Sequence, residues 1–131
     1  MSSGVGQVQS GKILLVEDHS LNLVLLEQML EWLGLEADVA EDGERAVEMA
    51  CGGVYRLVLM DIQLPGMDGV EAARQIRGRA SIIQPVIVAM TASAYLEERR
   101  RCLEAGMEDV LIKPFKLVDI KRVIDAYLEP D

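Results

Sequence analysis

Residues 57–69 read LVLMDIQLPGMDG. The first four residues form a continuous apolar run that is typical of a buried strand, and the run stops at the acid Asp61. A turn-forming sequence follows at residues 64–69, where proline, glycine and aspartate favour a loop. Apolar residues then recur at helical spacing through Ile76. The stretch therefore predicts a buried strand that ends in a carboxylate and leads through a loop into a helix.

Four further segments have a strand-like composition, and they cover residues 13–16, 37–40, 86–90 and 110–112. Between the strands, apolar residues recur at the three- and four-residue steps of amphipathic helices. We expect these helices at residues 20–33, 42–50, 70–76, 95–105 and 120–128. Five strand–helix alternations without a linker between halves predict one α/β layer sandwich, with a parallel sheet and helices on both faces.

Four residues mark predicted helix ends. Ser20 and Asp42 are candidate N-caps, because a side-chain oxygen at that position can accept a hydrogen bond from a free backbone N–H. Gly34 and Gly106 are expected to stop helices, because glycine tolerates the left-handed conformation at a C-terminus. Residues 1–11 are rich in serine and glycine. We therefore expect a flexible N-terminal segment there and one folded domain over residues 12–129.

The composition limits the partners and the compartment. The 131-residue chain carries a formal net charge of -9, which argues against direct binding of nucleic acid or anionic lipid. No apolar run approaches the roughly 18 to 20 residues of a membrane span, and residues 1–11 lack the apolar stretch of a signal peptide. Cys51 and Cys102 form neither a CxxC motif nor part of a histidine–cysteine cluster, so no disulfide framework or zinc site is indicated. We expect a cytoplasmic protein with a protein partner.

Polar residues end four of the predicted strands, and parallel strands bring their ends together at one edge of a sheet. The residues concerned are Glu17, Asp18, Asp61, Thr91 and Lys113. Three carboxylates at close range repel one another unless a cation lies among them, and oxygen ligands favour Mg²⁺. A lysine ammonium and a threonine hydroxyl suit the oxygens of a phosphoryl group. The pattern predicts a site for phosphoryl transfer.

Asp61 is the preferred nucleophile, because it ends a central strand alone and precedes a loop rich in glycine and proline. Glu17 and Asp18 are then available to hold the metal. The alternative interpretation is that each acid caps a helix or lies solvated at a strand end, as single aspartates often do. Five residues of complementary chemistry at four strand ends favour the shared site.

The motifs at the strand ends resemble those of the receiver domain of two-component response regulators, over about residues 12–128. The matching pieces are residues 13–18 (ILLVED), 59–69 (LMDIQLPGMDG), 90–92 (MTA) and 113–115 (KPF). The resemblance implies a flavodoxin-like (βα)5 fold, a three-layer sandwich whose five-stranded parallel sheet has the order 2-1-3-4-5. It also implies a cis peptide bond before Pro114.

The resemblance implies a role for each polar strand end. Asp61 resembles the phosphoacceptor, and Thr91 resembles the switch hydroxyl that is drawn toward the phosphoryl group. Lys113 resembles the lysine that contacts that group. The implied ligands of Mg²⁺ are Glu17, Asp18, Asp61 and the backbone carbonyl of Gln63. The chain would then be a phosphoacceptor switch that takes part in its own phosphorylation and dephosphorylation, and not an enzyme with a separate substrate.

The resemblance also implies the partners. A histidine kinase or a histidine phosphotransfer protein would donate the phosphoryl group from a phosphohistidine, and an unknown downstream protein would bind the altered surface. A homodimer through the fourth and fifth strand–helix region is a further expectation. Asn22, Gln63 and residues 106–109 resemble receivers of hybrid kinases and phosphorelays. Val110 stands where the family often has Tyr or Phe, which puts switching by an aromatic side chain in doubt.

Three other functions share parts of this pattern. A phosphatase-type hydrolase with an Asp nucleophile also needs Mg²⁺, but it usually carries a second acid two residues after the nucleophile, where this chain has Gln63. A pseudo-receiver typically loses an acid, the threonine or the lysine, and this chain retains all five polar residues. A flavin-binding protein needs a phosphate-cradling loop after the first strand, where Glu17 and Asp18 would repel phosphate. The receiver interpretation is preferred.

Overall fold

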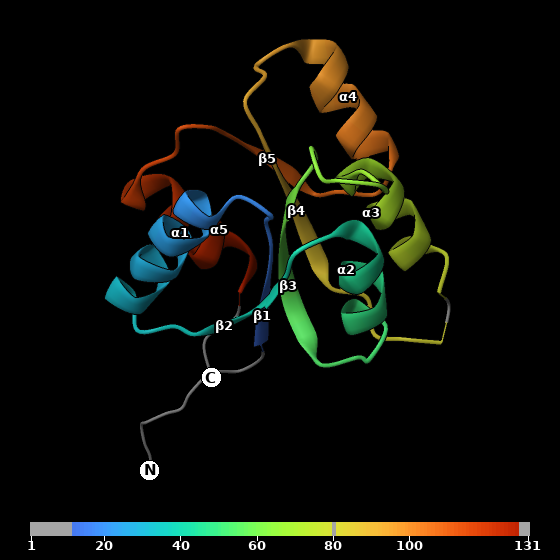
Figure 1. Cartoon of the computed structure of the whole chain (residues 1–131), viewed down its shortest axis with the longest axis horizontal. Helices are drawn as coiled ribbons and strands as arrows, with labels where there is room; N and C mark the ends of the chain where they lie inside the picture. Colours follow the sequence, from blue (N-terminus) through green and yellow to red (C-terminus); the bar gives the residue numbers. More distant parts are fainter. Residues whose placement is uncertain (1–11, 80, 129–131) are drawn as a thin grey trace.

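The computed structural model describes residues 12–79 and 81–128. Within these residues, five parallel strands form one sheet that is flanked by five helices (Figure 1). The strands are β1 (Lys12–Val16), β2 (Ala37–Ala40), β3 (Tyr55–Asp61), β4 (Val86–Thr91) and β5 (Asp109–Ile112). The helices are α1 (Ser20–Trp32), α2 (Gly43–Ala50), α3 (Gly69–Arg77), α4 (Leu96–Glu104) and α5 (Leu117–Tyr127). The predicted flexible segment at residues 1–11 and residue 129 of the predicted domain lie outside the described residues.

The sheet has the strand order β2-β1-β3-β4-β5, and every neighbouring pair is parallel. Leu59 of β3 pairs with Leu15 of β1 on one side and with Val88 of β4 on the other, so β3 is the central strand. In Figure 1, α1 and α5 cover one face of the sheet, and α2, α3 and α4 lie toward the other. The predicted fold class and strand order are confirmed.

The apolar core is divided in two by the sheet. Along β3, Leu57 and Leu59 contribute to the cluster that includes residues of α1 and α5, whereas Val58 and Met60 contribute to the cluster with α2 and α3. A strand that is buried on both faces must be apolar at every position. This requirement explains why residues 57–60 show no alternation of polar and apolar side chains.

Helix α1 differs from the prediction at its first residue. Ser20, the expected N-cap, is already helical, and His19 occupies the cap position without a side-chain cap bond. The N–H of His19 donates instead to the Glu17 carboxylate at 3.2 Å. The prediction for Ser20 was wrong. The buried carboxylate of Glu17 binds the N–H of His19, and this bond fixes His19 as the residue that precedes the helix.

Several other predicted ends are confirmed. The Asp42 carboxylate accepts a hydrogen bond from the N–H of Arg45 at 2.7 Å, as an N-cap should. Gly34 and Gly106 have φ values of 77° and 97°, in the left-handed region that glycine adopts at helix ends. The peptide bond between Lys113 and Pro114 is cis, as the resemblance implied.

Candidate functional site

The carboxyl ends of β1, β3, β4 and β5 bring the predicted site residues to one edge of the sheet. Asp61 is the last residue of β3 and Thr91 is the last residue of β4. Glu17 and Asp18 follow β1 directly, and Lys113 follows β5. The carboxyl ends of the strands lie at the same edge because every neighbouring pair of strands is parallel. Residues that are 96 positions apart in the chain therefore share one site.

Three carboxylates form the acidic part of the site. One oxygen from each of Glu17, Asp18 and Asp61 lies within 4.8 Å of the other two. Glu17 and Asp61 are buried, with exposed fractions of 1% and 3%, whereas Asp18 is exposed. Burial weakens the screening of their mutual repulsion. The cluster therefore offers two protected carboxylates and one that faces solvent.

Lys113 supplies positive charge to this cluster. Its Nζ lies 3.0 Å from Oδ2 of Asp61 and 3.6 Å from Oε1 of Glu17. The lysine side chain is mostly buried, so its attraction to the two carboxylates is less screened than at the surface. When all three acids are ionised, one ammonium leaves an excess of negative charge. The residues present can accommodate a further cation.

The effect of that excess negative charge is clearest at Glu17. Its Oε1 is buried and has no hydrogen-bond partner among the described residues, although Oε2 accepts the N–H of His19. Burial raises the pKa of Glu17, and the neighbouring charge of Asp61 raises it further, against the opposing effect of Lys113. An orphaned, buried carboxylate oxygen beside two other acids suits a hard cation such as Mg²⁺. The donor set therefore fits the predicted metal.

The loop after β3 holds Asp61 in position. Its Oδ1 accepts a hydrogen bond from the N–H of Gln63 at 2.9 Å, while Oδ2 contacts Lys113. The chain then turns back so closely that a Cβ at Gly69 would overlap the backbone oxygen of Asp61 and would lie 2.7 Å from Cα of Ile62. Only glycine fits at this approach, which starts helix α3 against the end of β3.

Thr91 is buried beside the acidic cluster, with 2% of its surface exposed. Its carbonyl accepts the N–H of Lys113 at 2.7 Å, so the backbone at both residues is tied into the sheet. Its hydroxyl accepts a hydrogen bond from the N–H of Ser93 at 3.0 Å.

The side chain of His19 is exposed and makes no hydrogen bond or ion pair among the described residues.

Two residues of the site were not singled out as functional by the sequence analysis. Gly69 was noted only as part of a turn, although a glycine at a loop–helix junction is a signal of close backbone approach. Ser93 had no such signal, because its bond to Thr91 depends on the local path of the loop after β4. Fold and site together define a doubly wound α/β domain with a buried aspartate between a lysine and two further acids.

Comparison with known families and proteins agrees with this class. The family model of the response regulator receiver domain matches residues 13–125. The chain is 37% identical over 123 residues to hybrid signal transduction histidine kinase L of Dictyostelium discoideum, covering 89% of this chain and 7% of that protein. It is 41% identical over 116 residues to the aerobic respiration control sensor protein ArcB of Escherichia coli strain K12, covering 88% of this chain and 15% of that protein.

Solved structures give the same result. The receiver domain of sensor histidine kinase PA1611 from Pseudomonas aeruginosa PAO1, with a magnesium ion coordinated in its active site cleft, superposes with a TM-score of 0.82 at 39% identity, covering 91% of this chain and 98% of that chain. The receiver domain of Saccharomyces cerevisiae Ssk1, solved with the histidine phosphotransfer protein Ypd1, has a TM-score of 0.80 at 33% identity, covering 89% of each chain.

The chain belongs to the response regulator receiver domain family, whose members are phosphoacceptor switches. It spans only 7% to 15% of the length of the two curated relatives described above. Among the residues that the structure describes, no helix is both long and apolar enough to cross a membrane.

Proposed function

We propose that this domain accepts a phosphoryl group on the carboxylate of Asp61, in a Mg²⁺-dependent reaction, and changes its surface for a partner as a result. The observation that carries the proposal is the position of Asp61. It is buried at the end of β3, its Oδ2 lies 3.0 Å from Nζ of Lys113, and two further carboxylates lie within 4.8 Å. This combination supports transfer of an anionic group to a carboxylate, because the attacking oxygen has a cation beside it.

The donor in this proposal is a phosphohistidine of a histidine kinase or a histidine phosphotransfer protein. The bond from phosphorus to the imidazole nitrogen breaks as the bond from phosphorus to an Asp61 oxygen forms, and the bonding electron pair returns to the imidazole. Lys113 holds the acceptor carboxylate before transfer and remains close enough to contact the phosphoryl oxygens afterwards. The co-crystal of the Ssk1 receiver with Ypd1 supports this class of partner.

Magnesium would be held by Glu17, Asp18, Asp61 and the backbone carbonyl of Gln63. The orphaned Oε1 of Glu17 supports this assignment, as does the magnesium ion in the PA1611 receiver. When bound, Mg²⁺ would neutralise charge on the phosphoryl oxygens during transfer. The chain's own residues orient the acceptor, since the N–H of Gln63 and the ammonium of Lys113 contact the two oxygens of Asp61.

Thr91 is the proposed switch residue. A phosphoryl group adds roughly 1.5 to 2 negative charges and several hydrogen-bond acceptors, so a buried hydroxyl on the neighbouring strand gains a strong partner. The side chain of Thr91 would turn to donate to it. A downstream protein, or a second copy bound through α4, β5 and α5, would then bind the altered surface, and the cytoplasm remains the predicted compartment.

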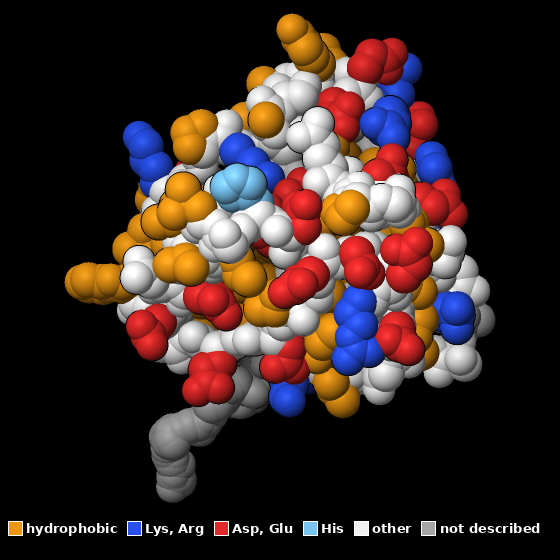
Figure 2. Space-filling model, in the orientation of Figure 1, with side chains coloured by type: hydrophobic (Ala, Val, Ile, Leu, Met, Phe, Trp, Pro, Cys, Tyr) orange, Lys and Arg blue, Asp and Glu red, His pale blue; other side chains and the backbone are white. Residues whose placement is uncertain are grey.

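The phosphodonor is proposed to dock on α1. This helix starts at Ser20, two residues after Asp18, and its outer face exposes Leu21, Val24 and Leu25, with exposed fractions of 61%, 49% and 44%. Figure 2 shows hydrophobic side chains gathered over α1. A helix that is apolar on its outer face as well as its inner face is typical of one that a partner covers. A protein bound there would reach the acceptor at the adjacent edge of the sheet.

The test of the acceptor is intact mass after incubation with acetyl phosphate and Mg²⁺. We expect one phosphoryl adduct on the wild type and none on Asp61→Asn. Asp68→Asn is the matched control, because Asp68 caps α3 in the same loop but lies outside the acidic cluster, and it should still be labelled. Labelling of Asp61→Asn, or an unlabelled wild type under conditions that label another receiver, would contradict the proposal. Turnover of a phosphomonoester that Asp61→Asn abolishes would indicate a hydrolase instead.

A further inference from the structure

Helix α4 is anchored unevenly along its length. Cys102 is its one buried residue, and the first two turns, residues 96–101, have exposed or partly exposed side chains. Leu96 at the first position is 81% exposed. Beyond Cys102, Ala105 and Met107 are buried in the core with it. The C-terminal end of α4 is therefore held by apolar packing, and the N-terminal end is not.

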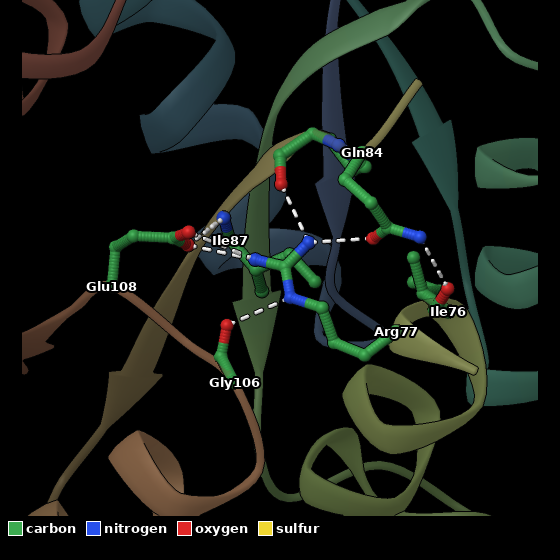
Figure 3. A network of polar contacts seen from close by, with 7 residues as sticks. Ile76, Arg77, Gln84, Ile87, Gly106 and Glu108 are labelled. Atoms are coloured by element: carbon green, nitrogen blue, oxygen red, sulfur yellow. Dashed lines mark hydrogen bonds and ion pairs between the residues drawn. The ribbon is translucent and has the colours of Figure 1, made fainter. Parts of the chain in front are cut away.

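A polar network fixes that C-terminal end more firmly (Figure 3). The guanidinium of Arg77 donates from Nε to the carbonyl of Gly106 at 2.9 Å and from Nη2 to the carboxylate of Glu108 at 2.8 Å. It also donates from Nη1 to the carbonyl of Pro85 at 2.7 Å, and Glu108 accepts the N–H of Ile87. The loop after α4 is thereby bound to both α3 and the start of β4.

The N-terminal end of α4 is held by two hydroxyls in series. Oγ1 of Thr91 accepts the N–H of Ser93 at 3.0 Å, and Oγ of Ser93 accepts the N–H of Tyr95 at 3.2 Å. Tyr95 is the N-cap residue of α4, yet its own side chain makes no cap bond and is 79% exposed. The ion pair from Arg101 to Asp68 spans 3.8 Å between half-exposed groups, and pairs of that kind contribute little.

These contacts constrain how Thr91 can move. Its backbone stays in the sheet, because its carbonyl accepts the N–H of Lys113 at 2.7 Å and Thr91 pairs with Ile112. Only the side chain is free to turn toward a group on Asp61. A hydroxyl that turns in this way gives up the N–H of Ser93. Ser93 then loses the hydrogen bond from its N–H to β4, which is the bond that ties the turn between Ser93 and Tyr95 to the sheet.

We propose that Ser93 is a positioning residue of the switch: its hydroxyl and N–H couple Thr91 to the N-terminal end of α4, so that phosphorylation frees the first turns of the helix. The proposal rests on the proposed phosphorylation of Asp61. The network around Arg77 keeps the C-terminal end of α4 in place, so the N-terminal end of the helix moves relative to Gly106. Val110 is buried with Cys102 and its side chain has no polar atom, so that side chain offers no competing hydrogen bond to Thr91.

The test is amide hydrogen exchange of the full chain, read by mass spectrometry over residues 95–101 and 102–107. Without phosphorylation, Ser93→Ala should exchange about five-fold faster than the wild type over residues 95–101, as expected for loss of one hydrogen bond. Residues 102–107 should be unchanged. Ser93→Thr keeps the hydroxyl and should match the wild type, as should Ser81→Ala, which changes an exposed serine before β4.

Saturating acetyl phosphate and Mg²⁺ provide the second arm, with the adduct measured by intact mass on every variant. The wild type and Ser93→Thr should exchange faster over residues 95–101 once phosphorylated. Ser93→Ala is already fast there and should gain little, a response that a merely structural serine would not show.

The outcomes separate the two proposals. If the wild type carries the adduct but its exchange over residues 95–101 does not change, the coupling through Ser93 is wrong and the acceptor role of Asp61 stands. If no adduct forms on the wild type, the proposed function fails, and the unphosphorylated comparison still decides whether Ser93 holds α4. Equal exchange in Ser93→Ala and the wild type in that comparison would overturn the inference.

Discussion

Among single residues, Arg77 links three segments of the fold, although the polar residues around it in the sequence are typical of a surface position. It lies at the end of α3, and its side chain is only 21% exposed. Its guanidinium contacts Gly106 and Glu108, which are 29 and 31 residues further along the chain. The planar fork of an arginine can serve acceptors in several directions at once, which a lysine ammonium on a flexible stem does less well.

We therefore predict that Arg77→Ala lowers the free energy of unfolding by about 2 to 4 kcal/mol, because it removes the arginine partner of two backbone carbonyls and breaks the ion pair with Glu108. Arg77→Lys should recover only part of that loss. Urea denaturation with an unchanged m-value measures both effects. Arg79→Ala is the control, since Arg79 is exposed and its side chain makes no hydrogen bond or ion pair to a described residue, and it should change stability by less than about 0.5 kcal/mol. Equal losses in Arg77→Ala and Arg79→Ala would contradict the role of the network.

At the scale of elements, α1 is the helix that the fold alone explains least well. Leu26 and Leu30 face the core, as their spacing predicts, but Leu21 and Leu25 lie on the outer face and are exposed. Exposed leucines at four-residue spacing gain nothing from burial in the isolated domain. They would gain it under a docked phosphodonor, and this supports the proposal that the phosphodonor binds α1.

Leu25→Glu should therefore slow phosphoryl transfer from a histidine phosphotransfer protein by about ten-fold or more, which corresponds to about 1.4 kcal/mol of lost contact. Labelling by acetyl phosphate should be unchanged, because a small donor needs no docking surface. Ile83→Glu is the matched control: Ile83 is also exposed, at 79%, but it precedes β4 and lies toward the opposite edge of the sheet. Docking elsewhere than α1 would be indicated if both variants transfer at the wild-type rate.

At the scale of the whole molecule, the excess negative charge links metal binding to stability. The chain has a formal net charge of -9, and three of its acids converge where one lysine faces them. A cation that binds the folded site, and has no comparable site in the unfolded chain, stabilises the fold by mass action. The metal site is therefore expected to appear in unfolding measurements without any phosphodonor.

Mg²⁺ at ten times its dissociation constant should raise the free energy of unfolding by about 1.4 kcal/mol, and a chelator should reverse the gain. Asp18→Asn should lose most of this increment, because it removes the exposed carboxylate of the cluster. Thermal melts with NaCl at matched ionic strength separate binding from general screening. An equal rise in NaCl, or in Asp18→Asn, would count against a metal site at Glu17, Asp18 and Asp61.

Much of the fold followed from local patterns. The apolar runs at residues 13–16, 57–60 and 86–90 predicted strands that the structure contains, because a strand buried on both faces needs apolar side chains at every position. The candidate site followed from one further step, since parallel strands end at a common edge. The first residue of α1 could not be predicted correctly from local patterns. It depends on the bond between the Glu17 carboxylate and the N–H of His19, and that bond depends on how the folded chain orients the carboxylate.

Patterns within the chain are enough to predict the strand–helix alternation and the acids, threonine and lysine at the strand ends, and the family motifs add the strand order. Contacts between distant atoms are visible only in the folded molecule, and they include the orphaned oxygen of Glu17, the close approach at Gly69, the network around Arg77 and the hydroxyls that hold α4. The two kinds of feature differ in the sequence separation of the residues that produce them. Periodicity and strand ends depend on residues that are neighbours in the sequence. Hydrogen bonds and burial depend on distances of a few ångströms between segments that only the fold brings together.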